Sequence, residues 1–345
     1  MEERTLSLLR IPAVLVALVL VLVACGGGGA SPTAEDMDPT DAADPTESPE
    51  AEAPDELVIG FVPSREADAL VETIQPVADY LSEQLGMPVS GVVTTDYTGL
   101  VTAMESDQAH IGAFGPFSLL QARDRAGAEI ILQSERFGSA TYHTQFMTNN
   151  PDKYCDDEPV VIDEETGWRN CNGTADAAEG PVGVEKISEI EEGTTVSFVE
   201  QASASGYIFP ATIFIQQGID PTTGIDPIFA GGHDSSVIAV CEGDAEVGVA
   251  FDDARGAAET DCDIAENVVV FAYGPEIPND GWAVLGSLPD DLKEDIKQAL
   301  LDYAASEEGA QVLNDIYEID NLVEADQESF SIVEDAAREL GVEGD

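Results

Sequence analysis

The chain has 345 residues, of which 43% are hydrophobic and 6% aromatic, so it can bury enough apolar surface to fold into more than one lobe. It carries 69 Asp and Glu against 13 Lys and Arg, a formal charge of −56 at pH 7. This charge repels nucleic acids and anionic membrane surfaces, which excludes DNA and RNA as expected partners.

The N-terminal segment has the pattern of an export signal. Its apolar run, residues 11–24, is shorter than the roughly 20 residues that a membrane span needs, and it ends in small residues. The sequence Leu22-Val23-Ala24-Cys25 resembles the lipobox of bacterial lipoproteins, in which a peptidase cuts before the cysteine and the thiol carries the lipid. A signal peptide with an incidental cysteine is the alternative.

The segment after Cys25 begins with four glycines and continues with Pro, Thr, Ala, Asp and Glu, with almost no large apolar side chain. This composition indicates a disordered acidic tether. We therefore expect a lipoprotein signal peptide over 1–25, a tether over 26–55, and a folded body held by a lipid at the extracytoplasmic face of the cell membrane.

Four further cysteines lie in the body. Their proximity in sequence and the oxidising compartment that an export signal implies predict the disulfides Cys155–Cys171 and Cys241–Cys262. The two other pairings remain possible. A four-cysteine zinc site is the rival interpretation, but no Cys-x-x-Cys pair occurs, so we expect no metal.

The body begins with a βαβ pattern. The apolar run 57–62 indicates a buried strand, apolar residues then recur at helical steps over 70–85, and Gly86 precedes a second strand at 89–94. The alternation continues with a helix over about 97–106, a strand over 109–114, a helix from Pro116, and strands over 130–133 and 141–148.

Residues 150–180 interrupt this alternation with two cysteines and many acids, and indicate a disulfide-closed surface excursion without a functional site. The alternation then resumes, which indicates a second α/β lobe. Its expected elements are strands over 194–199, 226–229 and 246–251 and helices over 207–217 and 234–241. Strands near 268–273 and 282–285 and helices over about 289–303, 306–317 and 326–340 are expected to complete the body.

Three turns between a strand and a helix offer donors to an anion. Ser203-Ala204-Ser205-Gly206-Tyr207 brings two hydroxyls and a glycine to a helix start, where unpaired N–H groups and the helix dipole favour negative charge. The other two turns are Gly115-Pro116-Phe117-Ser118 and Gly231-Gly232-His233-Asp234. Taken singly, the serines also fit helix N-caps, the second segment a plain turn, and the histidine a turn residue bonded to the following aspartate.

Taken together and in order, six segments resemble those of the phosphonate-binding proteins of ABC importers, from Leu57 to about Tyr303. The segments are Thr94-Thr95-Asp96-Tyr97, Gly115-Pro116-Phe117-Ser118, Ser203-Ala204-Ser205-Gly206-Tyr207 with Phe209-Pro210, Gly231-Gly232-His233-Asp234, Phe251-Asp252-Asp253-Ala254 and Ile277-Pro278-Asn279-Asp280. The resemblance implies an α/β fold of the periplasmic-binding-protein type II class, in which two α/β lobes joined by a two-stranded hinge close over a ligand cleft.

The resemblance also implies which residues contact the anion. Two tyrosines bond the phosphonyl oxygens, the first in a close match and the second in a looser one. Serines and backbone amides of the family's Ser-Thr-Ser-Gly loop follow, and a histidine and an aspartate lie at the cleft. In that order, the ligand-binding residues carried over are Tyr97, Tyr142, Ser203, Ala204, Ser205, Gly206, His233 and Asp280.

Two departures from the family pattern concern specificity. Ala204 replaces a threonine and so removes a hydroxyl. Relatives that hold an aminoalkyl tail place acids near it; here Asp280 is kept, whereas the alignment puts Arg255 near the second acid. An arginine facing the tail would repel an ammonium, so we expect compact anions to be preferred. The alternative is that Arg255 points to solvent and pairs with Asp252 or Glu259.

The expected division of the body is a first lobe over 56–148, a second lobe over 149–272 with the disulfide-closed insertion at 150–180, and a return to the first lobe with C-terminal helices over 273–345. The expected function is the capture of a small phosphorus oxyanion, phosphonate, phosphite or phosphate, for the permease and ATPase subunits of an ABC importer. No bond is made or broken, and no cofactor is expected.

Two other functions would use the same residues. A lipoprotein that presents its ligand to a sensor kinase would have the same fold and cleft. A phosphatase-like enzyme would use His233 and Asp234 as an acid–base pair or as metal ligands. No His-x-x-x-His motif, nucleophile elbow or cluster of metal-binding acids accompanies these two residues in the sequence, which argues against catalysis.

The lipobox predicts that the mature chain begins at Cys25 and that its thiol carries a lipid. Mass spectrometry of the N-terminal peptide from the membrane fraction measures both properties. An unmodified Cys25, or a mature chain that starts at another residue, would contradict the prediction.

Overall fold

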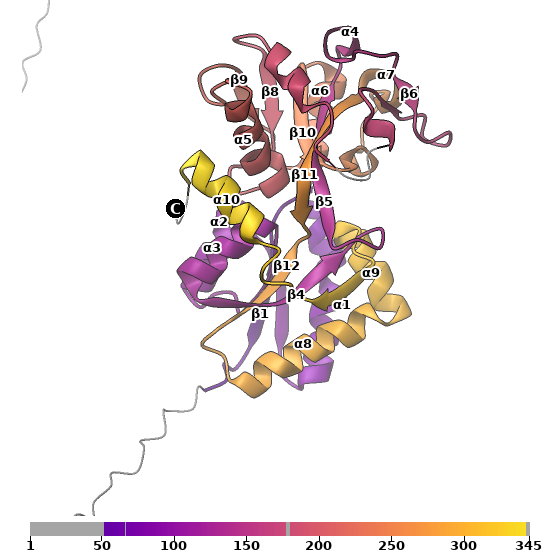
Figure 1. Cartoon of the computed structure of the whole chain (residues 1–345). Helices are drawn as coiled ribbons and strands as arrows, with labels where there is room; N and C mark the ends of the chain where they lie inside the picture. Colours follow the sequence, from indigo (N-terminus) through magenta and orange to yellow (C-terminus); the bar gives the residue numbers. More distant parts are fainter. Residues whose placement is uncertain (1–51, 66, 177–179, 343–345) are drawn as a thin grey trace, which may run out of the picture. The chain divides into compact units, whose positions relative to one another are not determined.

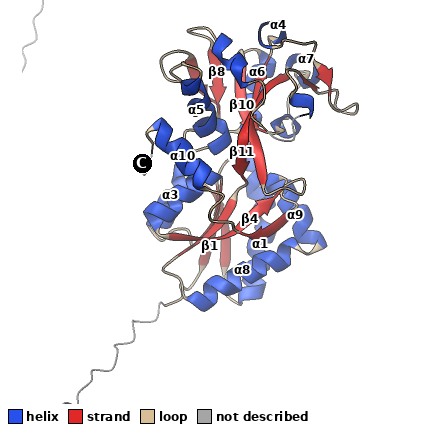
Figure 2. Cartoon of the chain, viewed as in Figure 1, coloured by secondary structure: helices blue, strands red, loops and turns tan. Residues whose placement is uncertain are grey.

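A computed structural model describes residues 52–65, 67–176 and 180–342 (Figure 1). The expected signal peptide, Cys25 and nearly all of the expected tether lie outside these residues. The strands of the described part form two sheets, and helices pack around each of them (Figure 2). No helix in the described part of the chain is long and apolar enough to cross a bilayer.

The first sheet has six strands in the order β13-β4-β12-β3-β1-β2. β1 pairs in parallel with β2 and β3, as the predicted βαβ alternation requires. β12 lies antiparallel between β3 and β4, so β4 runs in the same direction as β1 and β3, and the carboxyl ends of these three strands meet at one edge. The strands are β1 (Leu57–Phe61), β2 (Val89–Val93), β3 (Ile111–Phe114), β4 (Ala128–Glu135), β12 (Gly281–Leu285) and β13 (Asn321–Glu324).

Five helices pack with the first sheet and with one another. They are α1 (Ala67–Leu85), α2 (Tyr97–Glu105), α3 (Pro116–Ala126), α8 (Asp290–Ala304) and α9 (Glu307–Tyr317). The core beneath them contains the buried rings of Phe61 and Trp282, which meet edge to face with their centroids 5.8 Å apart. Trp282 is therefore a core residue, and its indole N–H lies 3.3 Å from the Ser134 hydroxyl.

The second sheet has seven strands in the order β6-β7-β11-β5-β10-β8-β9. The strands are β5 (Thr141–Thr148), β6 (Val160–Val161), β7 (Arg169–Asn170), β8 (Thr195–Phe198), β9 (Asp226–Phe229), β10 (Val247–Phe251) and β11 (Val269–Pro278). Its helices are α4 (Pro151–Tyr154), α5 (Phe209–Gln216), α6 (His233–Glu242) and α7 (Ile264–Asn267). A π-helical turn, Ala204–Ile208, leads directly into α5.

The chain passes between the two sheets twice, from β4 to β5 and from β11 to β12, and β5 and β11 lie side by side (Figure 1). Hydrogen bonds join the two crossings. The Asn279 N–H donates to the Ala140 carbonyl at 2.8 Å, its side-chain amide donates to the Ser139 carbonyl at 2.9 Å, and the Ser134 N–H donates to the Asp280 carbonyl at 2.9 Å. These crossings are the two-stranded hinge of the expected type II fold.

Both predicted disulfides are confirmed. Cys155 is bonded to Cys171, and Cys241 is bonded to Cys262. The four thiols are therefore not available as zinc ligands, and the described residues contain no other cluster of His, Cys, Asp and Glu that could hold a metal ion.

The structure differs from the sequence-based elements at several places, among them the short helices α4 and α7, which were not predicted. The helix predicted over 207–217 begins earlier, in the π-turn; the helix predicted over 326–340 begins at Ser331; β13 was not predicted; and the excursion contains the short strands β6 and β7. Strands of two to four residues carry too few residues to show a period of two, which explains why these three were missed.

The expected first lobe ends at residue 148 and so includes the strand 141–148. In the structure, β5 pairs with β10 and β11 in the seven-stranded sheet. The full division of the chain into domains remains a prediction.

The last helix, α10 (Ser331–Leu340), contacts α3 on one side and α5 on the other. The Arg123 guanidinium forms an ion pair with Glu334 at 2.9 Å, and the Thr212 hydroxyl donates to the Ala336 carbonyl at 3.3 Å. α10 therefore contacts one helix that packs with the first sheet, α3, and one that packs with the second sheet, α5.

Candidate functional site

A cavity lies where the carboxyl ends of the first-sheet strands face the helix starts of the second lobe. Its volume is about 20 Å³, on the measure by which one water molecule needs about 10–15 Å³. Both lobes and the hinge contribute to it. The lining residues are Val62, Ser64, Arg65, Tyr97, Gly115, Pro116, Arg136, Tyr142, Ser203, Ala204, Ser205, His233, Phe251, Asp280 and Tyr317.

Seven of the eight residues carried over from the family pattern line this cavity, so the structure brings together segments far apart in the sequence. Gly206 is the exception. Its N–H donates to the Ser203 hydroxyl at 3.1 Å, and a Cβ at this position would lie 2.4 Å from Val199 Cβ. Gly206 therefore serves the close packing of the turn, and only its neighbours face the cavity.

Ser203 is the N-cap of the turn that leads into α5. Because its oxygen already accepts the Gly206 N–H, its own proton is available to a group in the cavity. The N–H groups of Ala204 and Ser205 follow at the first helical positions, where no intrahelical acceptor exists. This segment therefore offers hydroxyl and backbone donors at the positive end of a helix, an arrangement that favours an anion.

A backbone hydrogen bond determines which ring nitrogen of His233 carries the proton. Its Nδ1 accepts the Phe251 N–H at 3.1 Å, so the proton of the neutral ring is on Nε2, which lies 3.4 Å from the Ser203 hydroxyl. Burial, together with the positive charges of Arg136 and Arg65, lowers the pKa of His233 to about 3. His233 is therefore a neutral N–H donor at ordinary pH.

Three buried tyrosines contribute neutral hydroxyls. Burial raises the pKa of Tyr97, Tyr142 and Tyr317, so none of them ionises at ordinary pH. Tyr142 lines the cavity together with Ser205, and the Tyr317 hydroxyl donates to the Val62 carbonyl at 2.6 Å.

Two arginines that the sequence analysis did not identify, Arg65 and Arg136, also line the cavity. The Arg136 guanidinium is hydrogen-bonded to the Asp280 carboxylate, and Arg65 forms an ion pair with Glu318 at 3.2 Å. Both guanidinium carbons lie within 5.9 Å of the centroid of the Phe251 ring.

A sequence signal for these arginines existed. Each follows the end of a predicted strand, and the carboxyl ends of parallel strands meet at one edge of a sheet. In a chain with only 13 Lys and Arg, a cation at such a position is informative. Tyr317, by contrast, is the last residue of α9 and carries no such signal.

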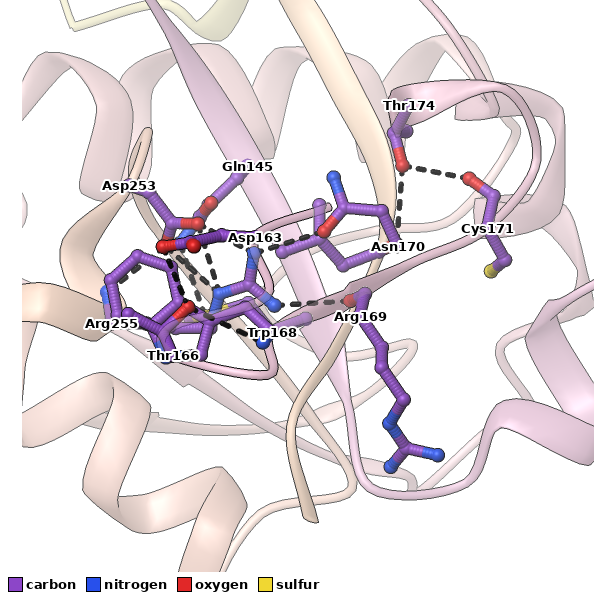
Figure 3. Close-up of polar contacts among 12 residues, drawn as sticks. Gln145, Asp163, Thr166, Trp168, Arg169, Asn170, Cys171, Thr174, Asp253 and Arg255 are labelled. Atoms are coloured by element: carbon purple, nitrogen blue, oxygen red, sulfur yellow. Dashed lines mark hydrogen bonds and ion pairs between the residues drawn. The ribbon is translucent and has the colours of Figure 1, made fainter. Parts of the chain in front are cut away.

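The expected placement of Arg255 is wrong. Its guanidinium is fully buried in the second lobe, bonded to the Asp253 carboxylate, to Asn170 Oδ1 at 2.9 Å and to the Arg169 carbonyl at 3.0 Å (Figure 3). It also lies over the Trp168 ring, 5.0 Å from the centroid. Arg255 neither lines the cavity nor points to solvent, because the disulfide-closed excursion folds back over it.

The two acids that precede Arg255 are engaged as well. Arg255 binds Asp253, and Asp252 accepts the His143 N–H at 2.7 Å and lies 3.2 Å from His143 Nδ1. Neither acid is among the cavity-lining residues.

The comparison with known families agrees with this site. The family described as the periplasmic substrate-binding protein of phosphonate ABC transporters matches residues 59–330. The chain belongs to this family.

Curated members of the family are related at low identity. The phosphate-import protein PhnD of Mycolicibacterium smegmatis is 28% identical over 211 residues, 58% of this chain and 56% of the relative, so that alignment spans little more than half of the relative's length. The "Probable ABC transporter phosphite binding protein PhnD1" of Prochlorococcus marinus is 20% identical over 300 residues, 85% of this chain and 92% of the relative.

Solved structures of the family share the fold. PhnD1 of Prochlorococcus marinus in complex with methylphosphonate superposes with a TM-score of 0.67 at 18% identity, over 84% of this chain and 99% of that one. A binding protein component of an ABC phosphonate transporter from Pseudomonas aeruginosa gives a TM-score of 0.65 at 20% identity, over 81% and 85% of the two chains.

The buried position of Arg255 predicts a structural role. Replacing it in Arg255→Met leaves the Asp253 carboxylate without its partner and should lower the free energy of unfolding by about 3–5 kcal/mol. The matched control is Arg338→Met, because Arg338 pairs with Asp335 on the surface, where such a pair is worth about 0–1 kcal/mol. Urea unfolding measures both; equal losses in the two variants would contradict the prediction.

The low pKa of His233 predicts a loss of stability in acid. The unfolded histidine titrates near 6.5 and the folded one near 3, so the unfolded chain binds more protons between these values and stability falls as pH is lowered. The slope is at most about 1.4 kcal/mol per pH unit. Urea unfolding of the parent and of His233→Gln from pH 7 to 4 should show converging stabilities; parallel curves would count against the assignment.

Proposed function

We propose that this chain is the extracytoplasmic substrate-binding protein of an ABC importer and that it captures a small phosphorus oxyanion, phosphate, phosphite or phosphonate, between its lobes. The observation that supports this most directly is the convergence of donors on one small cavity: the Nε2–H of His233, the hydroxyl of Ser203 and the guanidinium of Arg136. Family membership and the names of the relatives support the same ligand class.

The capture uses oriented donors in place of a large positive charge. Because His233, Tyr97 and Tyr142 stay neutral, they can donate to an oxyanion without the cost of burying further charges. Closure of the lobes expels water, and hydrogen bonds to a charged ligand become stronger in the drier site. Release reverses these steps, and no bond of the ligand is made or broken.

Asp280 supports a choice among oxyanions. An ionised carboxylate only accepts hydrogen bonds, and Asp280 is the one acid among the cavity-lining residues of the described chain. It therefore favours a ligand that carries a proton on one oxygen, as phosphate, phosphite and phosphonate monoanions do. Sulfate brings no such proton at neutral pH and would place its oxygens against the carboxylate.

The proposal also includes a location for the protein and its partners. A lipid on Cys25 would hold the body at the outer face of the membrane, and the acidic segment that follows would set its reach. The partners would be the permease and ATPase subunits of the importer. We infer that the protein has no catalytic role, since the cavity presents donors and one paired carboxylate and its chemistry suits binding.

The test is calorimetric titration of the full chain with phosphate, phosphite, methylphosphonate and sulfate. The first three should bind and sulfate should not. Ser205→Ala and His233→Ala should each weaken binding roughly ten- to hundredfold, because a hydrogen bond to a charged group is worth about 1.5–3 kcal/mol.

Two control variants lie away from the cavity. Ser188→Ala removes an exposed hydroxyl that donates to the Glu185 carbonyl, and His110→Ala removes a ring that accepts the Val58 N–H. Both should bind like the parent. If the Ser205 and His233 variants also bind like the parent, the cavity is not the binding site.

A further inference from the structure

Backbone hydrogen bonds hold Arg136 in place at the hinge. It begins the turn between β4 and β5, in which Arg136 and Ser139 exchange two backbone hydrogen bonds of 2.9 Å. The Asp320 carboxylate accepts the Phe137 N–H in the same turn. This geometry turns Phe137 outward, where it is 79% exposed, and turns Arg136 into the cavity, where it is 9% exposed.

The guanidinium of Arg136 connects the two hinge crossings. It binds Asp280, which lies on the second crossing, and its carbon lies 5.9 Å from the Tyr142 ring centroid and 5.8 Å from that of Phe251. Its Nε is buried without a hydrogen-bond partner in the described residues. A buried guanidinium N–H that lacks an acceptor at the wall of a cavity points to an anionic ligand.

The Arg136–Asp280 ion pair also determines which charges would surround a cationic substituent of the ligand. Asp280 is the one carboxylate among the described residues that line the cavity. Arg136 balances its negative charge through Oδ2, which leaves Oδ1 as a hydrogen-bond acceptor. Asp252 and Asp253 are engaged by His143 and Arg255. An ammonium in this cavity would therefore lie near two guanidinium groups and have no carboxylate of its own.

We propose that Arg136 is the specificity-determining residue of this site: by pairing with Asp280 it restricts the ligand to phosphorus oxyanions whose substituent, if any, carries no positive charge. This inference rests on the proposed function and deepens it. The sequence predicts that Arg255 repels an ammonium on the ligand. We assign this repulsion to Arg136, which lines the cavity.

The experiment compares two ligands of equal size. 2-Aminoethylphosphonate and n-propylphosphonate differ in whether an ammonium or a methyl group ends the tail. Calorimetric titrations of the full chain in mild detergent, at about 1 M salt so that the long-range field of the acidic surface is screened, give the ratio of the two dissociation constants. The parent should bind n-propylphosphonate at least tenfold more tightly.

Removal of the guanidinium should erase this preference. In Arg136→Gln the Asp280 carboxylate loses its partner. The Kd of 2-aminoethylphosphonate divided by the Kd of n-propylphosphonate should therefore fall at least tenfold. Arg136→Lys keeps the charge and should keep the sign of the preference. Arg125→Gln is the matched control, because Arg125 pairs with Glu105 away from the cavity, and its ratio should equal that of the parent.

The outcomes separate this inference from the proposed function. If the parent binds no phosphorus oxyanion, the proposed function fails. If the parent binds phosphate but prefers 2-aminoethylphosphonate to n-propylphosphonate, the role of Arg136 is overturned without recourse to any variant. Thermal unfolding of each variant establishes that it is folded, and an unchanged ratio in a folded Arg136→Gln protein also overturns the inference.

Discussion

The constraint on which the proposed function depends is that a chain with a formal charge of −56 would have to hold an anion. The long-range field of the protein opposes binding, so attraction must come from groups in direct contact with the ligand, where burial strengthens each interaction. The cavity meets this need with few full charges. Arg65 and Arg136 are each paired with an acid, and neutral hydroxyls, backbone amides and one neutral imidazole supply the remaining donors.

The fold places these donors at one point through its strand directions. β1, β3 and β4 run the same way, so the residues that follow them reach one edge of the first sheet. The second lobe brings its helix starts to the same place, since Ser203 precedes the turn into α5 and His233 begins α6. The backbone N–H of His233 donates to the Ser64 carbonyl at 3.0 Å, which links the two lobes beside the cavity.

Local patterns explain how much of this was predictable. Strands, helices and turns along each lobe follow from apolar periodicity, and both disulfides join cysteines that are close in sequence. The cavity residues Ser203, His233 and Asp280 lie in segments with a family pattern. Arg136 does not, and its importance depends on the contact with Asp280, 144 residues away. Arg255 was misplaced for the same reason, because its partner Asn170 lies 85 residues earlier, in an excursion whose path the sequence does not reveal.

The position of α10 has a consequence for how the protein changes shape. Because this helix touches α3 through Glu334 and α5 through Ala336 and Glu339, any motion that separates those two helices must break the contacts on one side of α10. The ion pair with Arg123 is partly exposed and contributes little. The Gln216 side-chain amide also donates to the Glu339 carboxylate at 3.1 Å, and Val333, Ala336 and Ala337 are buried, so detaching α10 costs apolar packing as well as polar contacts. α10 therefore biases the protein toward the compact arrangement. If an anion binds between the lobes as proposed, this contribution would be common to every such ligand, and it would affect the lifetime of the complex and not the choice of anion.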